Sequence, residues 1–174
     1  MHLPRPLYAL VRRAVPIVCV DTLPYRMVGA DLEAGLIRRV AEDGRSTGWA
    51  LVGGRVRREE TLQEALERHL CGSLGKNAQW HLPYEVERPL FAAQYFPHPR
   101  AGQRPDPRQH AIALSYLVEV TGEVSARGEA LDFRWFQLES LPPSHEIVFG
   151  QASVIEALVS SLRGMNMGKG VNNE

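Results

Sequence analysis

The stretch "GGRVRREETLQEALERHLCGSLG" spans residues 53–75 and decides how the rest of the chain is interpreted. It opens on two glycines and continues into a segment, 61–74, whose apolar residues recur at helical spacing on one face. Thr61 followed by Glu64 forms a capping box at the start of a helix, and Gly75 is a typical stop. The stretch therefore predicts a glycine loop that leads directly into an amphipathic helix.

Length and composition predict a single globular domain. The chain has 174 residues, of which 44% are apolar and 23% charged, enough for one sizeable core. Its 20 basic and 20 acidic side chains balance, so charge gives no reason to expect nucleic acid or an anionic membrane as partner. The apolar run "AVPIVCV" at 14–20 is too short to span a bilayer. We expect a cytoplasmic protein with one domain over 1–164 and a disordered tail over 165–174.

Residue patterns outside this stretch predict a mixed sheet between helices. Runs rich in β-branched and aromatic residues predict strands over 15–21, 35–41, 88–96, 110–120 and 132–138. The segment after the first strand carries Pro24 and Gly29 and is typical of a turn or a broken hairpin. Four prolines mark 97–109 as a long loop, and 144–164 predicts a second amphipathic helix behind a Ser144 cap. The predicted fold class is therefore α/β, with a mixed sheet sandwiched between helices.

The spacing within 53–75 resembles the box of Nudix hydrolases. Their pattern is a glycine, five residues, a glutamate, seven residues, then Arg-Glu-apolar-x-Glu-Glu-x-Gly. Here Gly54, Glu60, Arg68 and Gly75 keep that spacing. The resemblance covers residues 14–162 and implies a Nudix-type α/β/α sandwich with a mixed β-sheet. It also implies that Glu60 and Arg68 form a buried pair that fixes the loop on the helix.

Three carboxylates of the Nudix pattern are absent. The glutamate after Arg68 is replaced by His69, and the consecutive glutamates by Gly72 and Ser73. These glutamates matter because a divalent cation on the phosphates needs hard oxygen ligands. On a helix, carboxylates at i and i+3 or i+4 share a face and converge on one metal cluster. The helix of this chain offers no such carboxylate at those positions.

The chain looks most like the GDP-mannose mannosyl hydrolase branch, in which the box also departs from the pattern. That branch cleaves at the sugar carbon and releases GDP and the sugar. Asp21 ends the strand "VPIVCVD", and His110 belongs to "QHAIAL", both of which match strands of that branch. The resemblance implies a nucleotide-sugar ligand and catalytic roles for Asp21, Arg39, Arg68 and His110. It further implies substrate contacts from Arg55, Asp21 and Arg39.

The metal ligands are where the chain departs from this branch. The branch keeps one glutamate of the pair, where this chain has Ser73, and uses a histidine as general base, where this chain has Ala130. A neighbouring ligand position, an amide in the branch, holds Glu129. Any Mg²⁺ is therefore expected to bind weakly, through the carbonyl of Gly53 and the carboxylates of Glu129 and Glu60.

Two functional classes remain open on the sequence. The first is a hydrolase of a GDP-mannose-like nucleotide sugar with a weakened or relocated metal site, favoured by Asp21, His110 and Glu129. The second is an inactive Nudix-fold module that binds a nucleotide sugar or a nucleoside diphosphate, favoured by the missing glutamates and base. Arginines of the loop 97–109 either add to the diphosphate contact or belong to a solvated insert.

The N-terminal segment predicts how the chain assembles. The branch that it resembles is dimeric, with an N-terminal segment in the subunit contact. Here residues 1–14 occupy that place, and "LPRPLYALVRRAVP" at 3–16 is more apolar than a solvated tail needs to be. We therefore expect a homodimer with Leu7, Tyr8 and Leu10 at the contact.

Overall fold

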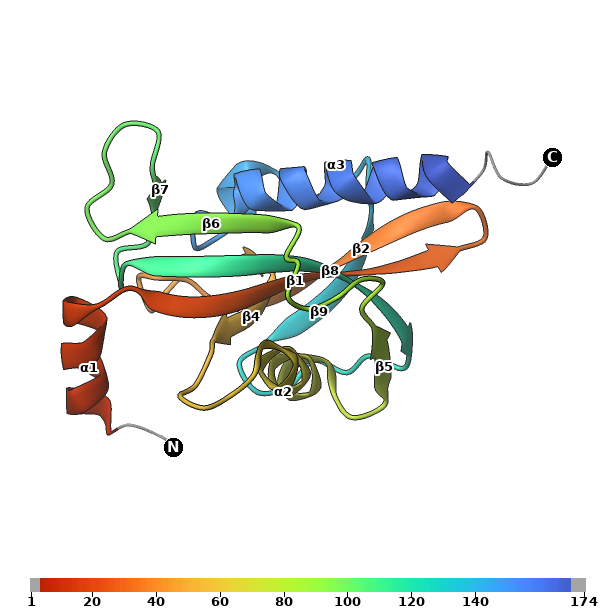
Figure 1. Ribbon diagram of the computed structural model, residues 1–174. Coiled ribbons are helices and arrows are strands. Elements are labelled where there is room, and N and C mark those ends of the chain that lie inside the picture. Colours follow the sequence, from red (N-terminus) through yellow and green to blue (C-terminus); the bar gives the residue numbers. More distant parts are fainter. Residues whose placement is uncertain (1–3, 170–174) are drawn as a thin grey trace.

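The computed structural model describes residues 4–169, which form one mixed sheet with helices on both faces (Figure 1). Its helices are α1 (Arg5–Ala14), α2 (Leu62–Leu74), the short 3₁₀ turn η1 (Ser144–Glu146) and α3 (Ala152–Lys169). Its strands are β1 (Ile17–Val28), β2 (Asp31–Val40), β3 (Thr47–Ala50), β4 (Val52–Arg55), β5 (Ala78–His81), β6 (Phe91–Phe96), β7 (Arg104–Pro105), β8 (Ala111–Gly122) and β9 (Asp132–Gln137). Figure 1 shows α2 below the sheet, α3 above it and α1 at one end. The predicted α/β/α sandwich with a mixed sheet is confirmed.

The sheet is mixed because its central strands, β1 and β8, run parallel over 17–25 and 111–119. The order along the sheet is β3-β2-β1-β8-β6-β7, with β4 added to β1, β5 to β8 and β9 to β2. β1 pairs with β4 over 19–22 and with β2 over 25–28, both antiparallel. The start of β1 is thereby held between β8 and the glycine strand β4, a position that the site uses.

Two apolar cores hold the helices on the sheet. On one face, Leu23 of β1 packs in a buried cluster with Ile155 and Leu158 of α3. On the other face, Val20 belongs to a cluster with Leu66 of α2. Side chains alternate along a strand, so even and odd residues of β1 serve different helices. Each fully buried side chain of this size stabilises the fold by about 1.5–3 kcal/mol.

The glycine loop and helix form as predicted from 53–75. The Thr61 side chain accepts a hydrogen bond from the Glu64 backbone N–H at 3.2 Å, and the Glu64 carboxylate accepts one from the Thr61 N–H at 2.8 Å. Gly75 ends α2 with a positive φ of 91°, a backbone conformation that favours glycine. Because these caps satisfy backbone groups that the helix cannot, each contributes about 1 kcal/mol.

Two predicted local features are wrong. The predicted turn is present at Gly29, where φ is 64°, but the first strand does not end at Asp21: β1 continues through Pro24 to Val28. Proline is tolerated inside β1 because it falls between the residues that pair with β4 and those that pair with β2. Ser144 lies in η1 and does not cap α3, which begins at Ala152.

At both ends of the described chain, helical structure is present where none was predicted. The N-terminal segment forms α1, which begins after Pro4 and ends with Arg12 and Arg13 in its last turn. α3 runs through Lys169, past the start of the tail predicted from 165, and residues 170–174 lie outside the described part of the chain. Within 4–169, no helix combines the length and apolar character needed to cross a membrane.

Candidate functional site

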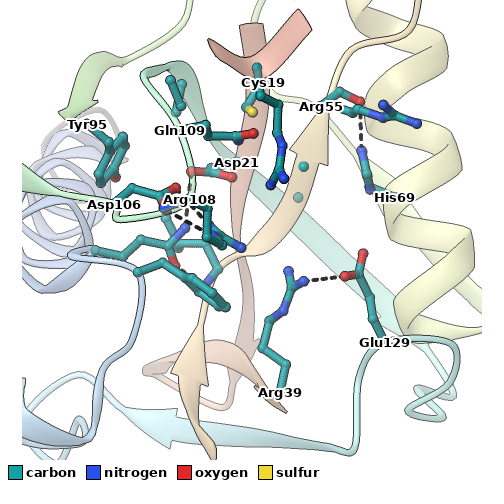
Figure 2. A pocket seen from close by; sticks show the side chains of 18 of the residues that line it. Cys19, Asp21, Arg39, Arg55, His69, Tyr95, Asp106, Arg108, Gln109 and Glu129 are labelled. Carbon is teal, nitrogen blue, oxygen red and sulfur yellow. Dashed lines mark hydrogen bonds and ion pairs between the residues drawn. The ribbon is translucent and has the colours of Figure 1, made fainter. Parts of the chain in front are cut away.

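A cavity of about 440 Å³ opens beside the start of β1, and arginines dominate its polar lining (Figure 2). Its cationic side chains are Arg12, Arg39, Arg55, Arg57, Arg68 and Arg108, and its carboxylates are Asp21, Asp106 and Glu129. Other lining residues include Tyr8, Cys19, Gly53, Gly54, His69, Tyr95, Gln109, Phe149 and Gln151. With guanidinium groups outnumbering carboxylates, the cavity is suited to an anionic ligand.

Asp21 is a buried carboxyl group at the wall of this cavity. It is 6% exposed, and its Oδ2 accepts a hydrogen bond from Gln151 Nε2 at 3.2 Å. Burial raises the pKa of Asp21 to about 6, although Gln151 and Arg39 act in the opposite direction. Asp21 pairs with Gly53 across β1 and β4, and a β carbon at Gly53 would collide with the Asp21 carboxylate. A carboxyl group that titrates near neutral pH is well matched to general acid–base work.

Glu60 and Arg68 form the ion pair predicted from the box. Arg68 donates from Nε to Glu60 Oε1 at 2.6 Å and from Nη2 to Oε2 at 2.7 Å. The Arg57 N–H donates to the same carboxylate at 2.7 Å, and Arg68 Nη2 reaches the Arg55 carbonyl at 2.9 Å. Because of these hydrogen bonds, with Arg68 the largest cause, the pKa of Glu60 falls to about 2. The pair therefore clamps the loop that carries Arg55 onto α2.

His69 takes the place of a glutamate of the Nudix pattern and faces the cavity. Its Nε2 lies 3.2 Å from the Arg55 carbonyl oxygen and 3.1 Å from Arg68 Nη1. Burial, helped by the charge of Arg68, lowers the pKa of His69 below its ordinary value and so favours the neutral ring. Gly54 lies against this ring, and a β carbon there would come within 2.7 Å of His69 Cε1.

Two further ion pairs line the cavity. Arg39 Nη2 donates to the Glu129 carboxylate, whose side chain is 50% exposed. Arg108 donates from Nε and Nη2 to the two carboxylate oxygens of Asp106, both at 2.8 Å. The Asp106 side chain is only 5% exposed, so this second pair is fixed, whereas Glu129 is free to leave Arg39 for solvent.

The carboxylates that were predicted to hold Mg²⁺ are paired with arginines in this structure. Glu60 is fixed by Arg68, and the half-exposed Glu129 pairs with Arg39. Among residues 4–169, no three His, Cys, Asp or Glu side chains lie together in a way that would hold a metal ion. Ser73, at a family ligand position, is 4% exposed within α2. The guanidinium groups that line the cavity can balance charge on a bound phosphate.

Most of the predicted site residues converge on this cavity. Asp21, Arg39, Arg55, Arg68, Gly53 and Glu129 all line it. His110 does not: its ring stacks on Phe96 at 4.7 Å between centroids and lines a neighbouring pocket. The structure therefore does not bring His110 together with the other predicted catalytic residues.

Several site residues were not predicted individually. Asp106 of the proline-rich loop was not predicted, whereas Arg108 is one of the loop arginines expected either to add to the diphosphate contact or to be solvated. Both line the cavity, so the loop is folded over the site in this region. Tyr8 of α1 lies under Arg55, whose guanidinium carbon is 4.0 Å from the ring centroid, and the Tyr8 hydroxyl donates to Gln109 at 3.4 Å. Gln151, just before α3, reaches back to Asp21.

Comparison with known proteins agrees with this architecture. Residues 4–162 match the model of a family described as a domain of unknown function, DUF4916. A search of the curated proteins found no match. A solved structure from Jonesia denitrificans, described as a possible asymmetric diadenosine tetraphosphate hydrolase, is 32% identical, with 84% of this chain and 94% of that chain covered and a TM-score of 0.75.

Two more distant structures share the fold. A MutT/Nudix family protein from Enterococcus faecalis is 19% identical, with 89% of this chain and 68% of that chain covered and a TM-score of 0.60. The Nudix domain of Shewanella oneidensis NrtR, solved with ADP-ribose, is 16% identical, with 92% and 99% covered and a TM-score of 0.56. The chain therefore belongs to the DUF4916 family, and it shares the fold of these Nudix structures.

Proposed function

We propose that the protein is a hydrolase of a nucleoside diphosphate sugar, similar in chemistry to the GDP-mannose mannosyl hydrolases. The observation that carries the proposal is a buried carboxyl group, Asp21, with a pKa of about 6 at the wall of an arginine-lined cavity. The arginines supply contacts for a diphosphate, and the carboxyl group supplies a base. The diadenosine tetraphosphate and the ADP-ribose named for two similar structures are also nucleoside phosphate derivatives.

The proposed reaction is attack of water on the sugar carbon. Deprotonated Asp21 takes a proton from the water as its oxygen bonds to that carbon. The bond between the carbon and the diphosphate oxygen breaks, and its electron pair stays on the leaving diphosphate. Arg39, Arg55 and Arg108 stabilise that charge without a metal held by box glutamates. The products are the free sugar and the nucleoside diphosphate, and any dependence on Mg²⁺ is weak.

A binding module without turnover is the second candidate. It is favoured by the box positions His69, Gly72 and Ser73, none of which offers a carboxylate. Such a module would use the same cavity for a nucleotide sugar or a nucleoside diphosphate. Phosphorus NMR of GDP-mannose incubated with the protein, with Mg²⁺ or with EDTA, separates the two. Appearance of GDP supports the hydrolase, and binding without any product supports the module.

Arg55→Ala is expected to weaken nucleoside diphosphate binding about tenfold to a hundredfold, because a charge-assisted contact to phosphate contributes about 1.5–3 kcal/mol. Calorimetry with GDP measures the effect, with micromolar affinity expected for the wild type. Arg100→Ala is a matched control, since Arg100 is exposed and does not line the cavity. Equal affinity of the wild type and Arg55→Ala would remove Arg55 from the proposed ligand contacts.

Glu129→Gln is expected to tighten binding of inorganic pyrophosphate about threefold to tenfold. The substitution keeps the shape of the side chain but removes the charge that competes with phosphate for Arg39. The gain is expected to shrink at high salt, because Glu129 is half-exposed and its pair is screened. Weaker binding by the variant in EDTA would contradict this role for Glu129.

The homodimer and the cytoplasmic location remain part of the proposal. Leu7 and Leu10 of α1 are 47% and 63% exposed, which leaves an apolar surface for a second copy, whereas Tyr8 faces the cavity. Light scattering at tens of micromolar is expected to give the mass of a dimer. Leu10→Lys is expected to give a monomer, since it places a charge in that contact. A monomer mass for the wild type would contradict the proposed dimer.

A further inference from the structure

Phe149 has an unusual backbone conformation for a large aromatic residue. Its φ is 61°, and Gly150 follows with φ at 64°. The Gln151 N–H donates to the Val148 carbonyl at 3.4 Å, so 148–151 is a tight turn with positive φ at both central residues. Glycine, asparagine and aspartate are the usual residues at such positions, because a bulky side chain is strained there. The turn itself therefore does not explain why a phenylalanine occupies this position.

The Phe149 ring is in contact with two arginines of the cavity. It is 5% exposed, and the guanidinium carbons of Arg108 and Arg39 lie 4.1 Å and 4.8 Å from its centroid. Both distances are within the range of favourable cation–π contacts. The ring therefore bridges two cationic side chains that come from distant parts of the chain, the loop before β8 and the strand β2.

Arg39 depends on this ring more than Arg108 does. Arg108 is held by both carboxylate oxygens of the buried Asp106. Arg39 has one hydrogen-bonded partner, the half-exposed Glu129, and its buried Nε has no partner among the described residues. When an anionic ligand displaces Glu129, the ring of Phe149 is the contact that keeps the Arg39 guanidinium beside the cavity.

The turn that carries the ring is itself firmly anchored. The Val148 N–H donates to the Trp49 carbonyl at 3.0 Å, and the Leu51 N–H donates to Gln151 Oε1 at 2.9 Å. Gly150 lies so close to the loop that a β carbon would come within 2.7 Å of the Pro105 carbonyl oxygen. The backbone is thereby locked on both sides, which fixes where the ring lies.

We propose that Phe149 is a positioning residue for the anion site. Its ring holds Arg39 and Arg108 at fixed places on the cavity wall and so preorganises both for the diphosphate of the ligand. The turn with positive φ at Phe149 is the conformation that places the ring against both guanidinium groups. The inference rests on the proposed diphosphate binding and adds the residue that prepares the site for it.

Calorimetry with inorganic pyrophosphate and with GDP tests the proposal. Phe149→Leu is expected to raise both dissociation constants about fivefold to twentyfold, because it removes the cation–π contacts. Phe149→Tyr keeps the ring and is expected to stay within about twofold of the wild type. Phe149→Met is a second aliphatic variant should the leucine variant fail to fold. Phe136→Leu is the matched control: its ring packs on Trp49 at 5.0 Å, outside the cavity, so it is expected to lower the melting temperature but leave affinity unchanged.

A double-mutant cycle separates positioning from simple packing. If Phe149 acts through Arg39, Phe149→Leu loses most of its effect on affinity in an Arg39→Ala background. If Phe149→Leu weakens binding equally in the Arg39→Ala background, the inference is wrong. It is also wrong if the wild type binds and Phe149→Leu binds with the same affinity. Both results leave the proposed function standing. A wild type that binds neither pyrophosphate nor GDP would overturn the proposed function together with it.

Discussion

Asp21→Asn is expected to abolish turnover while making the fold more stable at pH 7.5. Asparagine has the same shape and retains a partner for Gln151 but cannot accept a proton from water. Loss of a general base lowers the rate about a hundredfold to ten-thousandfold. Chromatographic assay of sugar release measures the first effect. Asp31→Asn is the control, because Asp31 is exposed at the hairpin turn.

The stability gain follows from the direction of the pKa shift. Burial raises the pKa of Asp21 from its ordinary 3.8 to about 6, so the folded protein binds this proton more tightly than the unfolded chain. The resulting stabilisation is complete below pH 4 and is lost as the pH rises through 6. Above that, the buried charge costs the fold about 1–3 kcal/mol, which Asp21→Asn removes. Urea unfolding at pH 7.5 and pH 4 measures the difference.

Two results would contradict this account of Asp21. One is an asparagine variant that still releases sugar at the wild-type rate. The other is an asparagine variant that is less stable than the wild type at pH 7.5, which would mean that the carboxylate is well solvated or paired. In the wild type, the rate is expected to fall below pH 6 as Asp21 becomes protonated.

Glu60→Ala is expected to lower the free energy of unfolding by about 2–4 kcal/mol, because it leaves the partly buried Arg68 guanidinium without its carboxylate. The variant also loses the contact to the Arg57 N–H, so the loop that carries Arg55 is released. GDP binding is therefore expected to weaken as well. Glu67→Ala, on the exposed side of α2, is the control and is expected to change stability by less than about 0.5 kcal/mol.

The pH dependence of the Glu60 effect has the opposite sign to that of Asp21. The pKa of Glu60 is lowered from 4.5 to about 2 by Arg68 and the loop N–H. Its contribution is therefore fully present above pH 4.5 and is lost as the pH falls through 2. Thermal melts of the wild type and Glu60→Ala are expected to converge between these values. A constant gap down to pH 2 would argue that packing, and not the ion pair, carries the effect.

The glycine loop and helix of residues 53–75 are predicted well because the residues that specify them lie close together in the sequence. The Thr61 and Glu64 cap, the helical period and the stop at Gly75 all act within a few residues of one another. The effect of Pro24 was predicted wrongly because proline is only a local turn signal. In the sheet, the pairing partner of β1 changes at this proline, and the strand continues.

The parts of the site that were not predicted depend on long-range contacts. Gln151 contacts Asp21, which lies 130 positions away in the sequence, and no local pattern indicates this contact. Asp106 lies in a loop whose prolines suggest solvent exposure, yet the fold of that loop buries the carboxylate against Arg108.

Hydrolysis of GDP-mannose in ¹⁸O-labelled water, followed by mass spectrometry of the products, tests the central claim most directly. Attack at the sugar carbon puts the label in the sugar and none in GDP, and this is the predicted result, with little change on adding EDTA. Label in a phosphate product would show attack at phosphorus and contradict the proposed role of Asp21. If the protein binds GDP-mannose tightly but forms no product, the proposed hydrolase activity is contradicted and the protein is a binding module.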